Sequence, residues 1–161
     1  SRCQGFHIAK IDQTEFTARI AEILITEGIT PDLDTLDTFV KATYPDLRKC
    51  INMVQQNVVD GALVMPQQGD SGETDWKLDM VELFKAGKIQ EARKLLCGSV
   101  RAEEMEEIYR WLYDNIELFG NDQQQDQAVL IIKQGLVDHT LVVDPEINLA
   151  ATLIRLSRLG E

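Results

Sequence analysis

Hydrophobic and polar positions repeat with the period of an α-helix along most of the chain. In the first part, the pattern predicts short amphipathic helices joined by tight turns. Asp12 is the expected N-cap of the first helix, and Gly28 is expected to end it, with Ile29 folding back as in a Schellman cap. Thr30 and Pro31 are predicted to be the N-cap and first residue of a second helix. The positions expected to face inward are Phe16, Ile20, Ile23, Leu24, Leu33, Leu36, Phe39, Val40 and Thr43.

A third helix is predicted after Pro45, because proline ends the helix before it and Asp46 offers a capping carboxylate. Its apolar stripe consists of Leu47, Cys50, Ile51, Val54 and Val58. Arg48 lies in the first turn, about 100° around the helix from Leu47 and at the edge of that stripe. A cation near the positive end of a helix dipole is unfavourable unless an anion joins it. Arg48 is therefore a candidate anion-binding residue; the alternative is a surface arginine in a salt bridge.

Turn residues then gather, and we predict a linker over 61–75 followed by a second helical domain over 76–161. Within that domain the pattern predicts helices over 76–87, 89–98 and 102–120, then a polar loop over 121–127 that leads into a further helix.

The last helix is predicted to start at Asp144-Pro145-Glu146, which supplies an N-cap, a first-turn proline and a first-turn acid. Its apolar residues cover more of the circumference than one core face requires, which indicates burial on more than one side. They are Ile147, Leu149, Ala150, Ala151, Leu153, Ile154, Leu156 and Leu159. The helix is either the centre of its own bundle or packs against the same region of a neighbouring subunit.

The charge balance restricts the partners. With 16 basic and 27 acidic residues the net charge is −11, so we expect this piece not to bind DNA by itself. No apolar run is long enough to span a bilayer. The cysteines (Cys3, Cys50 and Cys97) are expected to be reduced thiols of a cytosolic protein. His7 and His139 lack neighbouring ligands, so no zinc site is expected.

Two motifs carry a family resemblance. The run from Pro45 to Gln56, PDLRKCINMVQQ, resembles the second-sensor helix of AAA+ clamp-loader ATPases. The chain begins Ser1-Arg2-Cys3, which resembles the Ser-Arg-Cys box that ends the ATPase domain of replication factor C and T-even-like phage clamp loaders. The motifs are about 45 residues apart, as the family spacing requires. Pro45 departs from the family's usual glycine before the aspartate, which bears on the local turn geometry.

The resemblance implies an all-α fold, with a three-helix AAA+ lid bundle followed by a helical collar domain. Residues 1–10 would then be the end of an ATPase-domain strand and a linker, 11–60 the lid, 61–75 a linker, and 76–161 a collar that holds subunits together. The chain lacks an initiator methionine, and it would be the C-terminal part of a clamp-loader large subunit. The parent protein would use ATP and magnesium to load a sliding clamp onto primer–template DNA during replication, in the cytoplasm of a bacterial or phage-infected cell.

The resemblance also implies roles for two arginines. Arg2 would be an arginine finger that acts in trans on the ATP of the next subunit, and Arg48 would sense the nucleotide of its own subunit. The sequence has no phosphate loop and no paired acids after an apolar strand, so we expect no complete active site and no cofactor bound by this part alone. Expected partners are other clamp-loader subunits and, through the ATPase domain, the sliding clamp and DNA, with no membrane. Two alternatives are a stand-alone all-α interaction module and the lid of another AAA+ machine, such as a helicase loader.

Overall fold

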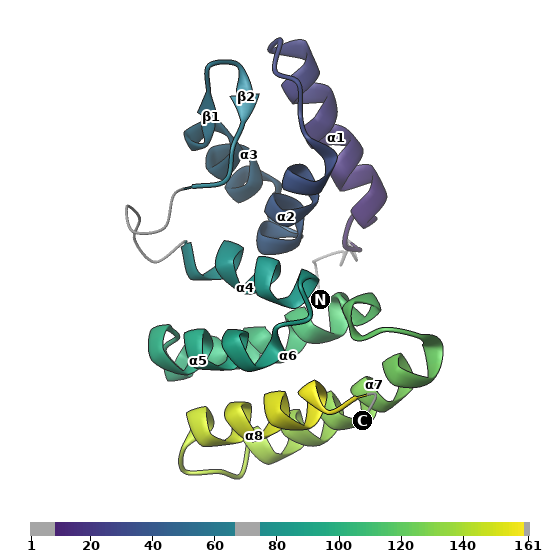
Figure 1. Ribbon diagram of the computed structural model, residues 1–161, viewed down its shortest axis with the longest axis vertical. Coiled ribbons are helices and arrows are strands. Elements are labelled where there is room, and N and C mark those ends of the chain that lie inside the picture. Colours follow the sequence, from purple (N-terminus) through teal and green to yellow (C-terminus); the bar gives the residue numbers. More distant parts are fainter. Residues whose placement is uncertain (1–8, 67–74, 160–161) are drawn as a thin grey trace, which may run out of the picture. The chain divides into compact units, whose positions relative to one another are not determined.

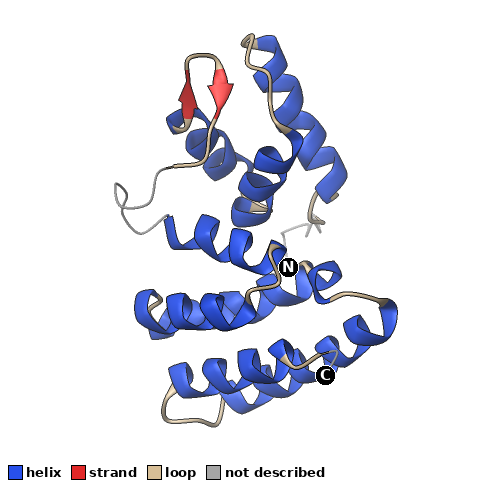
Figure 2. Cartoon of the chain, in the orientation of Figure 1, coloured by secondary structure: helices blue, strands red, loops and turns tan. Residues whose placement is uncertain are grey.

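The structure is a computed structural model that describes residues 9–66 and 75–159 (Figure 1). The chain divides into two compact units, residues 1–71 and 72–161. Helices dominate both units, and the described residues add only one small two-stranded sheet (Figure 2). The all-α prediction is therefore confirmed. Arg2 and most of the strand end expected over 1–10 lie outside the described residues.

The first unit is a three-helix bundle with a small hairpin. Its elements are α1 (Gln13–Thr26), α2 (Leu33–Thr43), α3 (Leu47–Gln56), β1 (Val58–Val59) and β2 (Ala62–Leu63). Its buried apolar side chains come from all three helices, and each helix contacts the other two. They include Phe16, Ile20, Leu24, Leu36, Phe39, Val40, Cys50, Met53 and Val54. Of these, Met53 was not expected from the stripe of the third helix.

The ends of α1 follow the sequence signals. The Asp12 carboxylate accepts a hydrogen bond from the backbone N–H of Thr14 at 2.8 Å, as an N-cap does. At the other end, the N–H of Ile29 donates to the carbonyl of Leu24 at 2.9 Å, and Gly28 has a φ of 75°. This is the bond pattern of a Schellman cap, and glycine adopts the left-handed conformation there without steric cost.

The prediction that Thr30 and Pro31 begin the second helix is wrong. Asp32 is the N-cap of α2, because its carboxylate accepts from both the N–H and the hydroxyl of Thr35, at 2.9 and 2.8 Å. Leu33 is consequently the first helical residue, and it is 76% exposed rather than inward-facing.

A β-hairpin follows α3 where the sequence indicated only the approach of the linker. Asp60 and Gly61 both have positive φ, 51° and 77°, as the central residues of a type I′ turn require. The hairpin also reaches back along the chain, because Thr30 forms an isolated parallel bridge with Ala62. That pairing accounts for the extended conformation of Thr30, which does not begin a helix.

The described part of the second unit, residues 75–159, contains helices and no strand. Its elements are α4 (Asp75–Lys85), α5 (Ile89–Ser99), the 3₁₀ turn η1 (Ala102–Glu104), α6 (Met105–Asp114), the 3₁₀ turn η2 (Ile116–Phe119), α7 (Asp122–His139) and α8 (Pro145–Ser157). α8 packs against both α5 and α7 (Figure 1). The core is one cluster that includes Trp76, Met80, Phe84, Leu96, Ile108, Tyr109, Leu112, Leu149, Leu153 and Leu156. Asp144 is the N-cap of α8 and Pro145 is its first residue, as predicted.

Two sequence expectations fail in this unit. The helix expected over 102–120 is interrupted at Asn115, whose side-chain amide and backbone N–H both donate to the carbonyl of Trp111. The polar run expected to be a loop is instead the first part of α7. There Asn121 and Gln124 form a reciprocal capping box, each side chain accepting from the other residue's N–H at 3.0 Å.

Candidate functional site

The start of α3 presents Arg48 to solvent. Asp46 is the N-cap, and its carboxylate accepts from the N–H of Lys49 at 2.9 Å, as the sequence predicted. Arg48 lies in the first turn and is exposed. Within the described parts of the chain, no ion pair or hydrogen bond holds its guanidinium. The surface salt bridge weighed as an alternative is therefore not formed with any described residue.

The opposite side of α3 anchors the helix in the bundle. Cys50, Met53 and Val54 are buried there. Burial, as the main cause, raises the pKa of the Cys50 thiol above its ordinary value, and the nearby Asp46 carboxylate adds to the shift. The thiol is therefore protonated at neutral pH and serves packing. A firmly packed inner face holds Arg48 at a defined position on the outer face.

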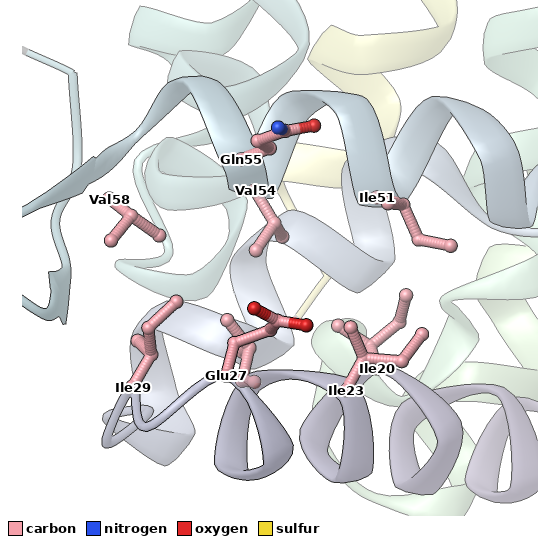
Figure 3. A pocket seen from close by; sticks show the side chains of 9 residues that line it. Ile20, Ile23, Glu27, Ile29, Ile51, Val54, Gln55 and Val58 are labelled. Carbon is pink, nitrogen blue, oxygen red and sulfur yellow. The ribbon is translucent and has the colours of Figure 1, made fainter.

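A groove of about 510 Å³ runs between α1 and α3 within the first unit (Figure 3). Its lining is mostly aliphatic and consists of Ile20, Ile23, Leu24, Glu27, Ile29, Ile51, Val54, Gln55 and Val58. The Glu27 carboxylate extends from the end of α1 toward Val54 of α3, as Figure 3 shows. Since Ile51 and Gln55 follow Arg48 by three and seven residues, all three lie on one side of α3. Arg48 is not one of the lining residues, but it lies about one turn before Ile51 on the same side of the helix.

The structure does not test whether the two predicted site residues, Arg2 and Arg48, lie near each other. Arg48 is placed as above, whereas Arg2 lies outside the described part of the chain. Glu27 in the groove was not expected, because it follows an exposed stretch of α1 and carries no motif. Tyr44 was also missed. Its contacts reach 33 residues back along the chain, and no periodic pattern reports such a separation.

The second unit carries an apolar surface of its own. Leu149, Leu153 and Leu156 of α8 are buried in the core, but Ile147 on the same helix is 68% exposed. The core of the second unit therefore buries only part of the apolar surface of α8. Exposed apolar side chains also occur on α7, on α8 and in their connection, and we refer to this set as the α7–α8 outer surface. It comprises Leu130, Val137, Leu141, Val143 and Ile147.

In residues 9–66 and 75–159, no three or more His, Cys, Asp or Glu side chains are grouped so that they could hold a metal ion. Among the same residues, no helix has both the length and the apolar composition needed to cross a membrane.

Comparison with known proteins extends the resemblance beyond the two motifs. The chain is 26% identical, over 170 residues of alignment, to a replication factor C small subunit of Methanopyrus kandleri, covering 99% of this chain and 26% of that protein. It is 25% identical over 169 residues to a replication factor C small subunit of Methanocaldococcus jannaschii, covering 99% of the chain and 9% of that protein. No family model matches the chain.

These similarities support the relationship to the clamp-loader family that the motifs suggested. Both alignments run through the second unit, where the sequence offered only a helical pattern and no motif. The chain spans about a quarter of the length of the first relative and about a tenth of the second.

Proposed function

We propose that this chain is the lid and collar part of a clamp-loader ATPase subunit. Its parent opens a sliding clamp and loads it onto primer–template DNA in DNA replication. The observation that carries the proposal is Arg48, exposed from the capped first turn of α3 in a three-helix unit. The relatives support it, because they match almost the whole chain and are named replication factor C small subunits.

Arg48 is the nucleotide sensor of its own subunit in this proposal. Its guanidinium suits a phosphate, because its planar, paired N–H donors match two phosphate oxygens at once. No described residue competes for it, so the group is available to an anion at the bundle surface. ATP, with magnesium, would supply the phosphates. The phosphate loop and the metal-binding acids would belong to a preceding ATPase domain, since this sequence contains neither motif.

Arg2 acts on a different nucleotide. In the Ser-Arg-Cys box it would reach the phosphates bound by the next subunit and stabilise the charge of the transferring phosphoryl group. An arginine finger of this kind typically accelerates phosphoryl transfer by ~10³–10⁵. The same site would therefore need two subunits, one that binds ATP and one that supplies Arg2.

Energetics indicate that Arg48 needs help to switch the lid. A charge pair at 4 Å contributes roughly 4 kcal/mol at an effective dielectric of 20. Moving a two-state equilibrium from almost fully open to almost fully closed requires about 5.5 kcal/mol of differential binding. Contacts between subunits would supply the remainder. The α7–α8 outer surface is the part of the second unit best suited to that contact, because its exposed side chains are apolar.

The test is ATP-dependent clamp binding by the full-length protein. Arg48→Ala should weaken clamp binding in ATP while leaving the helical fold intact, because the side chain is exposed and holds no described partner. Arg48→Lys should give an intermediate effect, since lysine keeps the charge but loses the paired donors. Arg19→Ala is the matched control: Arg19 is exposed in the same unit, and among the described residues its side chain pairs only with Glu22 at the surface.

The outcome also separates the alternatives. Clamp binding that is unchanged in Arg48→Ala would count against the sensor role. A parent protein without nucleotide dependence would indicate a stand-alone interaction module. Nucleotide dependence without clamp binding would indicate the lid of a different AAA+ machine.

A further inference from the structure

Tyr44 connects two segments that are distant in sequence. Its hydroxyl donates a hydrogen bond to the backbone carbonyl of Ile11 at 2.6 Å. Its ring packs edge-on against Phe16, with the ring centroids 5.4 Å apart and the planes at 79°. One side chain at the end of α2 thus holds the residues that lead into α1.

The carbonyl of Ile11 has no helical donor of its own. The first carbonyl used by α1 is that of Asp12, which accepts from the N–H of Phe16 at 2.9 Å. Ile11 therefore precedes the hydrogen-bonded helix, and the Tyr44 hydroxyl supplies a donor where the helix ladder cannot. The bond therefore holds the chain just before α1.

Tyr44 is also tied closely to the start of α3. Arg48 lies four positions after Tyr44, and two hydrogen bonds hold the intervening turn. The N–H of Asp46 donates to the carbonyl of Thr43 at 2.9 Å, and the Asp46 carboxylate caps α3 through Lys49. Because these bonds hold the turn, we expect a displacement of Tyr44 to move the first turn of α3 as well.

We propose that Tyr44 is a positioning residue that sets the orientation of Arg48 relative to the segment preceding α1. The inference rests on the proposed function, because the ATPase domain would join the lid through that segment. Tyr44 would then align the sensor arginine with the nucleotide while touching neither ATP nor its phosphates.

The first experiment tests, in the 161-residue chain, whether the Tyr44–Ile11 hydrogen bond orders the residues before α1. Tyr44→Phe removes only the hydroxyl and keeps the ring against Phe16, so the bundle should stay folded. Tyr113→Phe is the matched control, because Tyr113 is 48% exposed and its hydroxyl holds no described partner. We expect ¹⁵N relaxation to show lower order for the Ile11 and Asp12 amides in Tyr44→Phe and unchanged order in Tyr113→Phe. Unchanged order in Tyr44→Phe would overturn the anchoring role.

The second experiment is a double-mutant cycle in the full-length protein, read as the preference for ATP over ADP. We expect Tyr44→Phe to reduce the preference about fivefold, the effect of one neutral hydrogen bond. In an Arg48→Ala background the same change should have no further effect, because the group that Tyr44 positions is gone. An equal loss in both backgrounds, or no loss in either, would overturn the positioning role.

The two proposals fail in different ways. If Arg48→Ala leaves the nucleotide preference unchanged, the sensor function fails, and the positioning of Arg48 for that function fails with it. If Arg48→Ala lowers the preference and Tyr44→Phe does not, the sensor function stands and only this inference fails.

Discussion

Asn148 of α8 donates a hydrogen bond from its side-chain amide to the Tyr109 hydroxyl of α6, at 2.7 Å, where both residues are buried. The same amide nitrogen donates to the carbonyl of Gly135 in α7 at 2.8 Å. Burial raises the pKa of Tyr109 above its ordinary value, so the phenol remains a neutral hydrogen-bonding group. A single amide therefore joins three helices of the second unit.

Asn148→Ala should destabilise the second unit by about 2 kcal/mol, because it removes two hydrogen bonds from buried partners. The two tryptophans of the chain, Trp76 and Trp111, both lie in this unit, so urea unfolding followed by tryptophan fluorescence reports on it selectively. Gln123→Ala, an exposed position in the first turn of α7, should change stability by less than about 0.5 kcal/mol. Equal stability of Asn148→Ala and the wild-type chain would contradict the role of the amide.

Gly135→Ala should destabilise the same unit by about 1–3 kcal/mol, the usual range for overpacking. A Cβ at Gly135 would lie 2.4 Å from the Thr152 hydroxyl oxygen and 2.8 Å from Cε1 of Tyr109. Gly98→Ala in α5 is the matched control, since nothing lies within 4 Å of its Cβ position. It should stabilise the unit by about 0.5–1 kcal/mol through helix propensity. Urea unfolding should therefore show changes in unfolding free energy of opposite sign for the two variants. A stabilising Gly135→Ala would contradict the close packing of Gly135 against Thr152 and Tyr109.

Alkaline pH should weaken the first unit through Cys50. Burial raises the pKa of this thiol in the folded chain above the ordinary 9.0 that applies when it is unfolded. Between those two values the unfolded chain has lost the proton and the folded chain retains it, so stability falls as pH rises. We expect the free energy of unfolding of the wild-type chain, followed by circular dichroism, to decline above about pH 9 more steeply than that of Cys50→Ala. Parallel profiles for the two chains would refute this linkage.

Ile147→Asp should weaken assembly between copies or related subunits about tenfold or more, because a charge would enter the α7–α8 outer surface. The fold should be unaffected, since Ile147 is 68% exposed. Leu33→Asp is the matched control, with 76% exposure in the first unit. Sedimentation of the assembled complex is the measurement. If both variants dissociate to the same extent, the α7–α8 outer surface is not part of the subunit interface.

Local signals in the sequence predicted local structure well. Asp12, Gly28, Asp46 and Asp144 act as the caps that their residue types indicate, because each bonds to backbone within a few positions. The exposure of Arg48 at the edge of the α3 stripe also follows from helical periodicity. These features depend on neighbouring residues alone.

Non-local contacts explain what the sequence left unpredicted. Threonine is a common N-cap residue, but Thr30 instead pairs with Ala62, which lies 32 residues later in the chain. The groove between α1 and α3 and the Tyr44–Ile11 bond likewise depend on tertiary packing. The helical start at Asn121 is a different case, because the capping box lay within the sequence and the polar composition of 121–127 obscured it.

The two ties across the first unit have a mechanical consequence. The Thr30–Ala62 bridge joins the chain after α1 to the hairpin after α3, and the Tyr44–Ile11 bond joins the chain before α1 to the turn before α3. Because one contact lies at each end of α1, we expect both to limit changes in the width of the α1–α3 groove. We therefore expect α1, α3 and the hairpin to move together if a bound nucleotide displaces Arg48.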